Sequence, residues 1–199
     1  MLQAVVLFLP VAAYLALSPG PATAMVIQSA ASGGRRRAVV TMSGNALGLA
    51  LWAVASMLGV SALVVASAAA FAVLKIVSGV LLVVLGVQAI RNARRPHPQD
   101  TPERRERSAF RAGLLTALAN PKVALFYVAL LPQFVPAGAS VLLTTLLLAA
   151  VQIALSCAWY FLLASVVSYA REVVLRSRRV IEYVSGCAMI GFGIKIASE

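Results

Sequence analysis

The chain has 199 residues, of which 61% are hydrophobic and only 12% are charged, and its mean hydropathy is +0.93. Soluble domains usually carry about 25% charged residues, so this composition excludes an ordinary soluble protein and predicts an integral membrane protein. The formal net charge of +11 does not indicate a nucleic-acid partner, because all fourteen arginines are confined to short segments between long apolar intervals.

Long intervals with almost no charge predict six membrane spans, because a helix that crosses a bilayer needs about 20 mostly apolar residues. The intervals that fit one span each are residues 1–34 and 180–197, and those that fit two spans each are residues 38–90 and 112–170. Turns are expected near residues 66–70 and 131–138. The first interval has no basic segment ahead of it and stays apolar beyond the length of a signal peptide, so we expect an uncleaved span.

The first predicted span, roughly residues 3–28, contains a break. The break consists of Ser18, Pro19, Gly20, Pro21 and Ala22. Pro21 has no N–H and crowds the carbonyl four residues earlier, so we expect it to free the carbonyl of Leu17. Ser18 ahead of Pro19 has the form of a helix N-cap followed by proline. Broken backbone at membrane depth persists only where it is buried in protein or lines a wet cavity, so this stretch is a candidate functional centre.

The second predicted span begins near Val39 and contains the polar residue Asn45. Gly44 and Gly48 form a GxxxG pattern, which allows two helices to approach closely. The pattern leaves two uses open, packing inside this bundle and dimerisation, and we favour the first.

The third predicted span covers roughly residues 71–90 and is followed by a segment rich in proline and arginine. Residues 92–109 mix basic and acidic side chains, which favours a solvated cytoplasmic linker. The only histidine, His97, lies between two prolines in this segment and is expected to be an ordinary loop residue.

The fourth predicted span begins near Phe110 and contains a second break at Asn120-Pro121-Lys122. We expect Pro121 to free the carbonyl of Ala117 and Asn120 to cap the following helix. Lys122 is the only charge near the membrane centre, about 16 Å deep at about 1.5 Å per residue. A charge at that depth is a functional candidate by default, although carbonyls freed at the break offer a structural role instead.

The fifth and sixth predicted spans, roughly residues 141–167 and 180–197, complete a second unit that repeats the first. Residues 107 apart match in kind: Val77-Ser78-Gly79 with Val184-Ser185-Gly186, Gly86 with Gly193, Trp52 with Trp159, and Asn45 with Gln152. The proline breaks match at an offset of 102. With three spans in each unit, the second must enter the membrane from the opposite side.

The predicted fold is therefore an all-α integral membrane protein of six transmembrane helices, arranged as two inverted three-helix repeats. Its first and fourth helices are broken at the proline motifs, and binding is expected at the repeat interface near the midplane. The predicted units are residues 1–91, the linker 92–109 and residues 110–199.

All fourteen arginines fall within three segments, Arg35–Arg37, Arg91–Arg111 and Arg171–Arg179. These are alternate connections of a six-span chain, so they lie on one face of the membrane. The positive-inside rule predicts that these loops are cytoplasmic and that both termini are outside. Attraction to anionic membrane lipid is the expected by-product.

The interiors of the predicted spans contain no Asp or Glu. Sites for hard divalent cations usually need carboxylate oxygens, and zinc sites need grouped His, Cys or carboxylate ligands, so we expect no metal and no cofactor. The lone histidine, in the linker, argues against a Ser/His/Asp hydrolase and favours a protein that is not an enzyme. Cys157 and Cys187 are isolated and indicate packing rather than a disulfide or a metal site.

The two breaks suggest an anion site. If half-helices start there, their free N–H groups and positive dipole ends suit a carboxylate. Asn45 and Gln152 occupy matching positions in the two units, where they are able either to bind a substrate amino group or to join helices, and the sequence leaves both readings open.

These motifs resemble a known family. Ser18-Pro19-Gly20-Pro21, Asn120-Pro121-Lys122, Leu125-Phe126 and Leu131-Pro132-Gln133-Phe134, in a chain of 199 residues, are similar to the lysine exporter family of the LysE/RhtB type. The resemblance implies a bacterial inner-membrane amino acid exporter that is coupled to the proton or ion gradient, and members often form homodimers. The family commonly has Asn where this chain has Ala22, so one substrate contact is absent. Exporters of basic amino acids should offer an acidic group, so neutral, small or aliphatic substrates are favoured here.

The resulting hypothesis is a secondary exporter of neutral amino acids. The substrate-binding residues that it names are Ser18, Pro19, Gly20, Pro21, Ala22, Asn45, Asn120, Pro121, Lys122 and Gln152. One alternative is a metal or inorganic-ion transporter, against which the missing carboxylates argue, and another is a non-transporting helper subunit. The sequence does not decide whether Lys122, water or the substrate carries a coupled proton.

Overall fold

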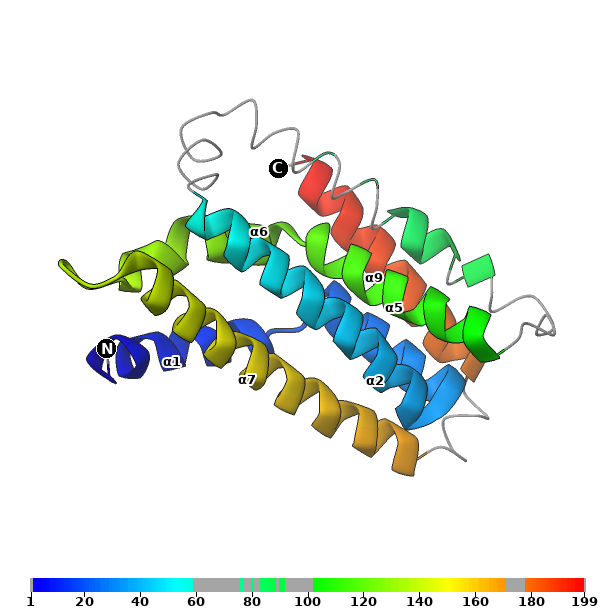
Figure 1. Ribbon diagram of the computed structural model, residues 1–199. Helices are drawn as coiled ribbons and strands as arrows, with labels where there is room; N and C mark the ends of the chain where they lie inside the picture. The colour runs from blue at the N-terminus through cyan, green and yellow to red at the C-terminus, as the bar shows by residue number, and fades with distance from the viewer. Residues whose placement is uncertain are drawn as a thin grey trace.

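A computed structural model describes residues 2–58, 76, 80, 83–88, 90–91, 102–170 and 178–198. Within these ranges the chain forms helices joined by turns, and it contains no strand. The long helices lie side by side (Figure 1). The N-terminus lies at one end of the bundle, and the last turns of the helix coloured yellow to orange lie at the other.

The first predicted break is confirmed. Helix α1 (Leu2–Leu17) ends before it, and helix α2 (Pro21–Met57) begins after it with Pro21 at its first position. The N-cap is Gly20, so the prediction of a cap at Ser18 is wrong. A residue before proline is disfavoured in helical conformation, so Gly20 is extended and the helix cannot begin at Pro19.

Helix α2 is two helical stretches, residues 21–33 and 35–57, that meet at Gly34. Gly34 has φ 69°, a left-handed conformation that favours glycine. The Thr41 hydroxyl donates a hydrogen bond of 2.8 Å to the Ser29 hydroxyl, so the second stretch packs back against the first. The first two predicted spans are therefore joined by a tight turn.

Helix α5 (Pro102–Leu118) begins before the predicted start of the fourth span near Phe110. Proline at the first position and Glu103 in the first turn both favour a helix start. Residues 102–109, predicted as the end of the linker, are therefore helical.

The second predicted break is also confirmed. After Ala119 and Asn120 the chain continues as helix α6 (Pro121–Leu125), the π-helix η1 (Phe126–Leu130) and the 3₁₀ helix η2 (Leu131–Phe134). The two sides of the break are bent by 53° relative to one another.

Helices α7 (Val141–Tyr169) and α9 (Arg178–Ser198) occupy the predicted fifth and sixth spans. In the described part of the chain, α2 and α7 are each long and apolar enough to cross a membrane, and the bent pair around Asn120 is a third candidate. Most of the predicted third span, including Val77-Ser78-Gly79, and the linker residue His97 lie outside the described residues. The six-helix count and the inverted repeat therefore stay predictions.

The GxxxG pattern packs inside the chain. A side chain at Gly44 would collide with the backbone carbonyl of Phe110, and one at Gly48 would meet the side chain of Ala117 at 2.5 Å. The reciprocal approach is equally close, because Gly113 of α5 faces the carbonyl of Thr41. These glycines allow α2 and α5 to touch along their backbones, as favoured over dimerisation.

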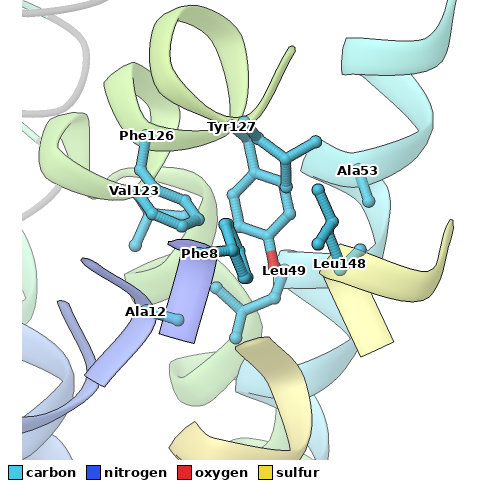
Figure 2. Close-up of a cluster of buried hydrophobic side chains, with 10 residues drawn as sticks. Phe8, Ala12, Leu49, Ala53, Val123, Phe126, Tyr127 and Leu148 are labelled. Carbon is cyan, nitrogen blue, oxygen red and sulfur yellow. The ribbon is translucent and has the colours of Figure 1, made fainter. Parts of the chain in front are cut away.

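The described residues form three buried apolar clusters, of which the smallest consists of Met25, Leu85 and Met189 and the two larger ones lie around the site. The aromatic cluster consists of Phe8, Ala12, Leu49, Ala53, Val123, Phe126, Tyr127, Leu131, Leu148 and Ala149. The small-residue cluster consists of Ala22, Val26, Ala30, Ala38, Met42, Tyr160 and Ala164. Figure 2 shows the ring of Tyr127 between Phe126 and Leu148 in the first cluster. Leu148 and Tyr160 belong to different clusters and lie about 18 Å apart along α7 at about 1.5 Å per residue, so the clusters occupy different depths of the bundle.

Candidate functional site

The two breaks meet in space. The Lys122 Nζ donates a hydrogen bond of 2.9 Å to the Ser18 hydroxyl, although the residues are 104 apart in the sequence. A Cβ atom added at Gly20 would lie 4.0 Å from the same Nζ. The ammonium group of the second break therefore lies over the backbone of the first.

A pocket lies beside this contact, between the two apolar clusters. Its empty volume is about 400 Å³, including the space through which it opens. The lining residues are Leu15, Ser18, Gly20, Ala22, Thr23, Asn45, Leu49, Asn120, Lys122, Val123, Gln152, Ser156 and Tyr160. Leu49 and Val123 belong to the aromatic cluster, whereas Ala22 and Tyr160 belong to the small-residue cluster.

Most residues of the predicted site surround this pocket. Those that line it are Ser18, Gly20, Ala22, Asn45, Asn120, Lys122 and Gln152. The predicted residues Pro19, Pro21 and Pro121 are not among the lining residues. Pro21 and Pro121 instead set the starts of α2 and α6, so these two prolines shape the backbone around the pocket.

Asn120 caps helix α6, as predicted. Its Oδ1 accepts a hydrogen bond of 3.1 Å from the backbone N–H of Lys122. The cap satisfies one of the N–H groups at the start of the helix and fixes the backbone position from which the Lys122 side chain extends.

The carbonyl of Ala117 finds a side-chain partner at the second break. Pro121 cannot donate to it, and it accepts instead from the indole Nε1 of Trp52 at 3.3 Å and from the backbone N–H of Asn120 at 3.3 Å. The sequence left open a structural role for Lys122, in which its ammonium would bind a carbonyl freed at the break. At Ala117 that role is filled by Trp52, and Lys122 donates to the Ser18 hydroxyl instead. Lys122 is also exposed on the isolated chain, contrary to the expectation of a buried ammonium.

Gln152 presents an unpaired acceptor next to the pocket. Its side chain is 1% exposed, its Nε2 donates to the Ser156 hydroxyl at 3.2 Å, and its Oε1 has no partner among the described residues. Because Gln152 and Ser156 are on the same helix, this bond does not join two helices. Asn45, the residue predicted to match Gln152 in the first unit, is buried on α2 and lines the same pocket.

Sequence reasoning missed six lining residues. Ser156 and Tyr160 follow Gln152 by one and two helical turns, so helical spacing from Gln152 would have found them. Thr23 lies in the first turn after the first break. Leu15, Leu49 and Val123 resemble many other apolar residues in apolar spans and carry no distinguishing signal.

Charge near the pocket comes from a single residue. Lys122 is the one charged side chain among the described lining residues. No group of three or more His, Cys, Asp or Glu within the described ranges is placed to hold a metal ion. The Arg36–Glu106 ion pair (2.7 Å) and the Arg35 guanidinium over the Phe161 ring (4.3 Å) hold α2 against α5 and α7 near the turn at Gly34.

Comparison with known proteins identifies the family. The LysE type translocator family matches residues 13–199. The chain is 32% identical to an uncharacterised membrane protein of Pseudomonas aeruginosa, covering 93% of this chain and 90% of that one. It is 26% identical to an uncharacterised membrane protein of Bacillus subtilis, covering 94% and 95% of the two chains, and 29% identical to the threonine efflux protein of Escherichia coli K12, covering 90% of each. No solved structure matches. Because the family match covers nearly the whole chain, this membrane-embedded protein belongs to the LysE type translocator family.

Proposed function

We propose that this protein is a secondary exporter of neutral amino acids or their close derivatives in the bacterial inner membrane. The observation that carries the proposal is the contact of Lys122 with Ser18, which joins the two helix breaks beside a pocket. The threonine efflux protein of Escherichia coli, at 29% identity, supports an amino acid as the substrate.

The pocket offers complementary groups to an amino acid. The carboxylate binds the Lys122 ammonium, which exchanges its bond to the neutral Ser18 hydroxyl for one in which both partners are charged. The unpaired Oε1 of Gln152 accepts from the substrate ammonium, with Asn45 nearby on α2. A buried acceptor without a partner is costly, so a substrate that donates to it gains affinity.

A neutral substrate side chain fits the remaining wall. Leu15, Leu49 and Val123 supply apolar surface, and the described lining residues include no carboxylate to pair with a basic side chain. Ala22, where the family commonly has Asn, adds only a methyl group.

Helix packing supports the inverted repeat. Exchanging the two units turns a contact between the first and fifth spans into a contact between the fourth and second spans, so a repeat requires both contacts. Residues 21–33 pack against α7 through the small-residue cluster, and residues 35–57 pack against α5 through Gly44 and Gly48. The same exchange leaves a contact between the third and sixth spans unchanged. Such a contact is present at Gly86, where an added Cβ would lie 2.6 Å from the Gly186 carbonyl. The breaks are 102 residues apart when counted from Ser18 to Asn120, but 100 apart when counted between the helix starts at Pro21 and Pro121. With the second offset, Lys122 corresponds to Ala22 in the proposed repeat.

The basic turn at Arg35–Arg37 is assigned to the cytoplasm and both termini to the outside, following the positive-inside rule. Export is coupled to the proton or ion gradient. Transport proceeds by alternating access of the pocket to the two sides.

Reconstituted vesicles test the proposal. Vesicles that contain the purified protein are loaded with labelled L-threonine, L-alanine or L-leucine, and efflux is followed with and without an imposed proton gradient. We expect gradient-dependent efflux of at least one of them, lowered by about 10- to 150-fold in Lys122→Met, because a hydrogen bond to a charged group contributes about 1.5–3 kcal/mol. Lys195→Met, a matched change on α9 outside the pocket, should leave efflux unchanged. Absence of gradient-dependent efflux of every amino acid would contradict the proposal.

A further inference from the structure

The two tryptophans of this chain, Trp52 and Trp159, are in opposite hydrogen-bonding states. The Trp52 indole N–H donates to the carbonyl of Ala117 at 3.3 Å. The Trp159 Nε1 is buried and has no partner among the described residues. A buried N–H without a partner is rare in folded proteins and costs free energy, so the difference needs a physical reason.

The two residues occupy matching positions in the two units. Trp159 follows Trp52 by 107 residues, the offset that relates the second span to the fifth. Trp52 packs against the aromatic cluster, and Trp159 packs against the small-residue cluster. Each tryptophan therefore lies beside one of the two apolar clusters that border the pocket.

The first break has a carbonyl that corresponds to the one Trp52 binds. Leu17 precedes Pro21 by four residues, as Ala117 precedes Pro121, and neither proline can donate to its carbonyl. Trp159 packs against the cluster that contains Ala22, the residue after Pro21. The indole without a partner therefore packs against a cluster that includes Ala22 of the first break, the break in which Pro21 cannot donate to the Leu17 carbonyl.

We propose that Trp52 and Trp159 are positioning residues that hold the two breaks alternately. In the conformation described here, Trp52 holds the carbonyl of Ala117 and with it the half-site of Lys122. In the opposite conformation Trp159 donates to the carbonyl of Leu17 and the bond of Trp52 opens. The inference rests on the inverted repeat and alternating access of the proposed function.

The clusters indicate which side is closed in the present conformation. The aromatic cluster borders the pocket on one side through Leu49 and Val123. Behind them the Phe8 ring meets the Phe126 ring in a tilted contact (5.6 Å between ring centroids) and the Phe134 ring edge-on (5.3 Å). On the side of the turn at Gly34 the cluster consists mainly of alanines, with Tyr160 as its one aromatic residue. The side held by Trp52 is thus the tightly closed one, and exchange of the tryptophan bonds accompanies opening of that side.

Nuclear magnetic resonance of the indole groups tests the exchange without any substrate. Protein labelled with ¹⁵N-tryptophan in lipid nanodiscs should give two Nε1–H signals, which Trp52→Phe and Trp159→Phe assign. We expect the Trp52 proton to exchange slowly with water and to resonate downfield of the Trp159 proton. In Trp52→Phe the present conformation loses one hydrogen bond, so the population with a bonded Trp159 should rise by roughly fivefold and its signal should move downfield.

Trp159→Phe carries the test if Trp52→Phe fails to fold, since it removes no bond that the present conformation makes. Trp52 should stay bonded in that variant, and its indole proton should exchange with water more slowly than in the wild type, because the conformation in which its bond opens is disfavoured. A Trp159 signal that does not respond to Trp52→Phe, or a Trp52 exchange rate that does not respond to Trp159→Phe, overturns the inference. Because neither readout involves transport, a failed efflux assay with responsive signals would instead contradict the proposed substrate.

Discussion

The two helix breaks differ in what holds them. The second break depends on one proline, is capped by the Asn120 side chain, and passes its freed carbonyl to Trp52. The first break has two prolines and a glycine cap with no side-chain hydrogen bond, and Ser18, whose hydroxyl Lys122 binds, is the one polar side chain among the residues with which it lines the pocket. The second break is thus chemically specialised, while the first is held open mainly by backbone restrictions.

Among changes that alter the backbone of the breaks, the largest effect on efflux is expected at the single proline of the second break. Pro121→Ala restores a donor for the carbonyl of Ala117, so the 53° bend should straighten and move Lys122 away from Ser18. We expect efflux to fall by about tenfold or more while the protein stays folded. Pro21→Ala should have a smaller effect, because Pro19 keeps the first break. Equal losses in the same vesicle assay would remove the distinction between the breaks.

The contact between α2 and α5, the helix that leads into the second break, should be sensitive to added volume. Gly44→Ala places a methyl group against the carbonyl of Phe110 and should lower the free energy of unfolding by about 1–3 kcal/mol. Gly191→Ala is the control, since no heavy atom of the described residues lies within 4 Å of an added Cβ there. Thermal unfolding in detergent measures both variants, and equal melting temperatures would mean that α5 is not packed on α2 as described.

Changes at the two helix caps should differ in their effect on stability, by less than the change at Gly44. Asn120→Ala removes the bond to the Lys122 N–H and should cost about 1 kcal/mol. Gly20→Ala removes no side-chain bond, and its extended φ of −173° suits any residue, so we expect a change within about 0.5 kcal/mol. Chemical denaturation in mixed micelles compares the pair, and a larger loss in Gly20→Ala would reverse the assignment of the caps.

The smallest expected effect is at the hydroxyl that joins the breaks. Ser18→Ala removes one hydrogen bond to Lys122, which remains exposed and able to bind water. Efflux should fall only about two- to fivefold, far less than in Lys122→Met. A loss as large as that of Lys122→Met would indicate that Ser18 itself contacts the substrate.

The sequence by itself determined the membrane class, both breaks, the cap at Asn120 and the polar residues Asn45 and Gln152. These features follow from composition, from the missing N–H of proline and from helical spacing, all of which act within a few residues. The local rule also failed once, at Ser18, because two nearby prolines compete to start the helix.

Tertiary structure alone decided which of these features meet. The bond of Lys122 to Ser18 spans 104 residues and that of Trp52 to Ala117 spans 65. Such contacts depend on how α2, α5 and α7 pack, which is set by the close approach of glycines and by the two apolar clusters. For the same reason no pattern in the chain singled out Leu15, Leu49 or Val123, since an apolar residue becomes part of a pocket only through the neighbours that the fold gives it.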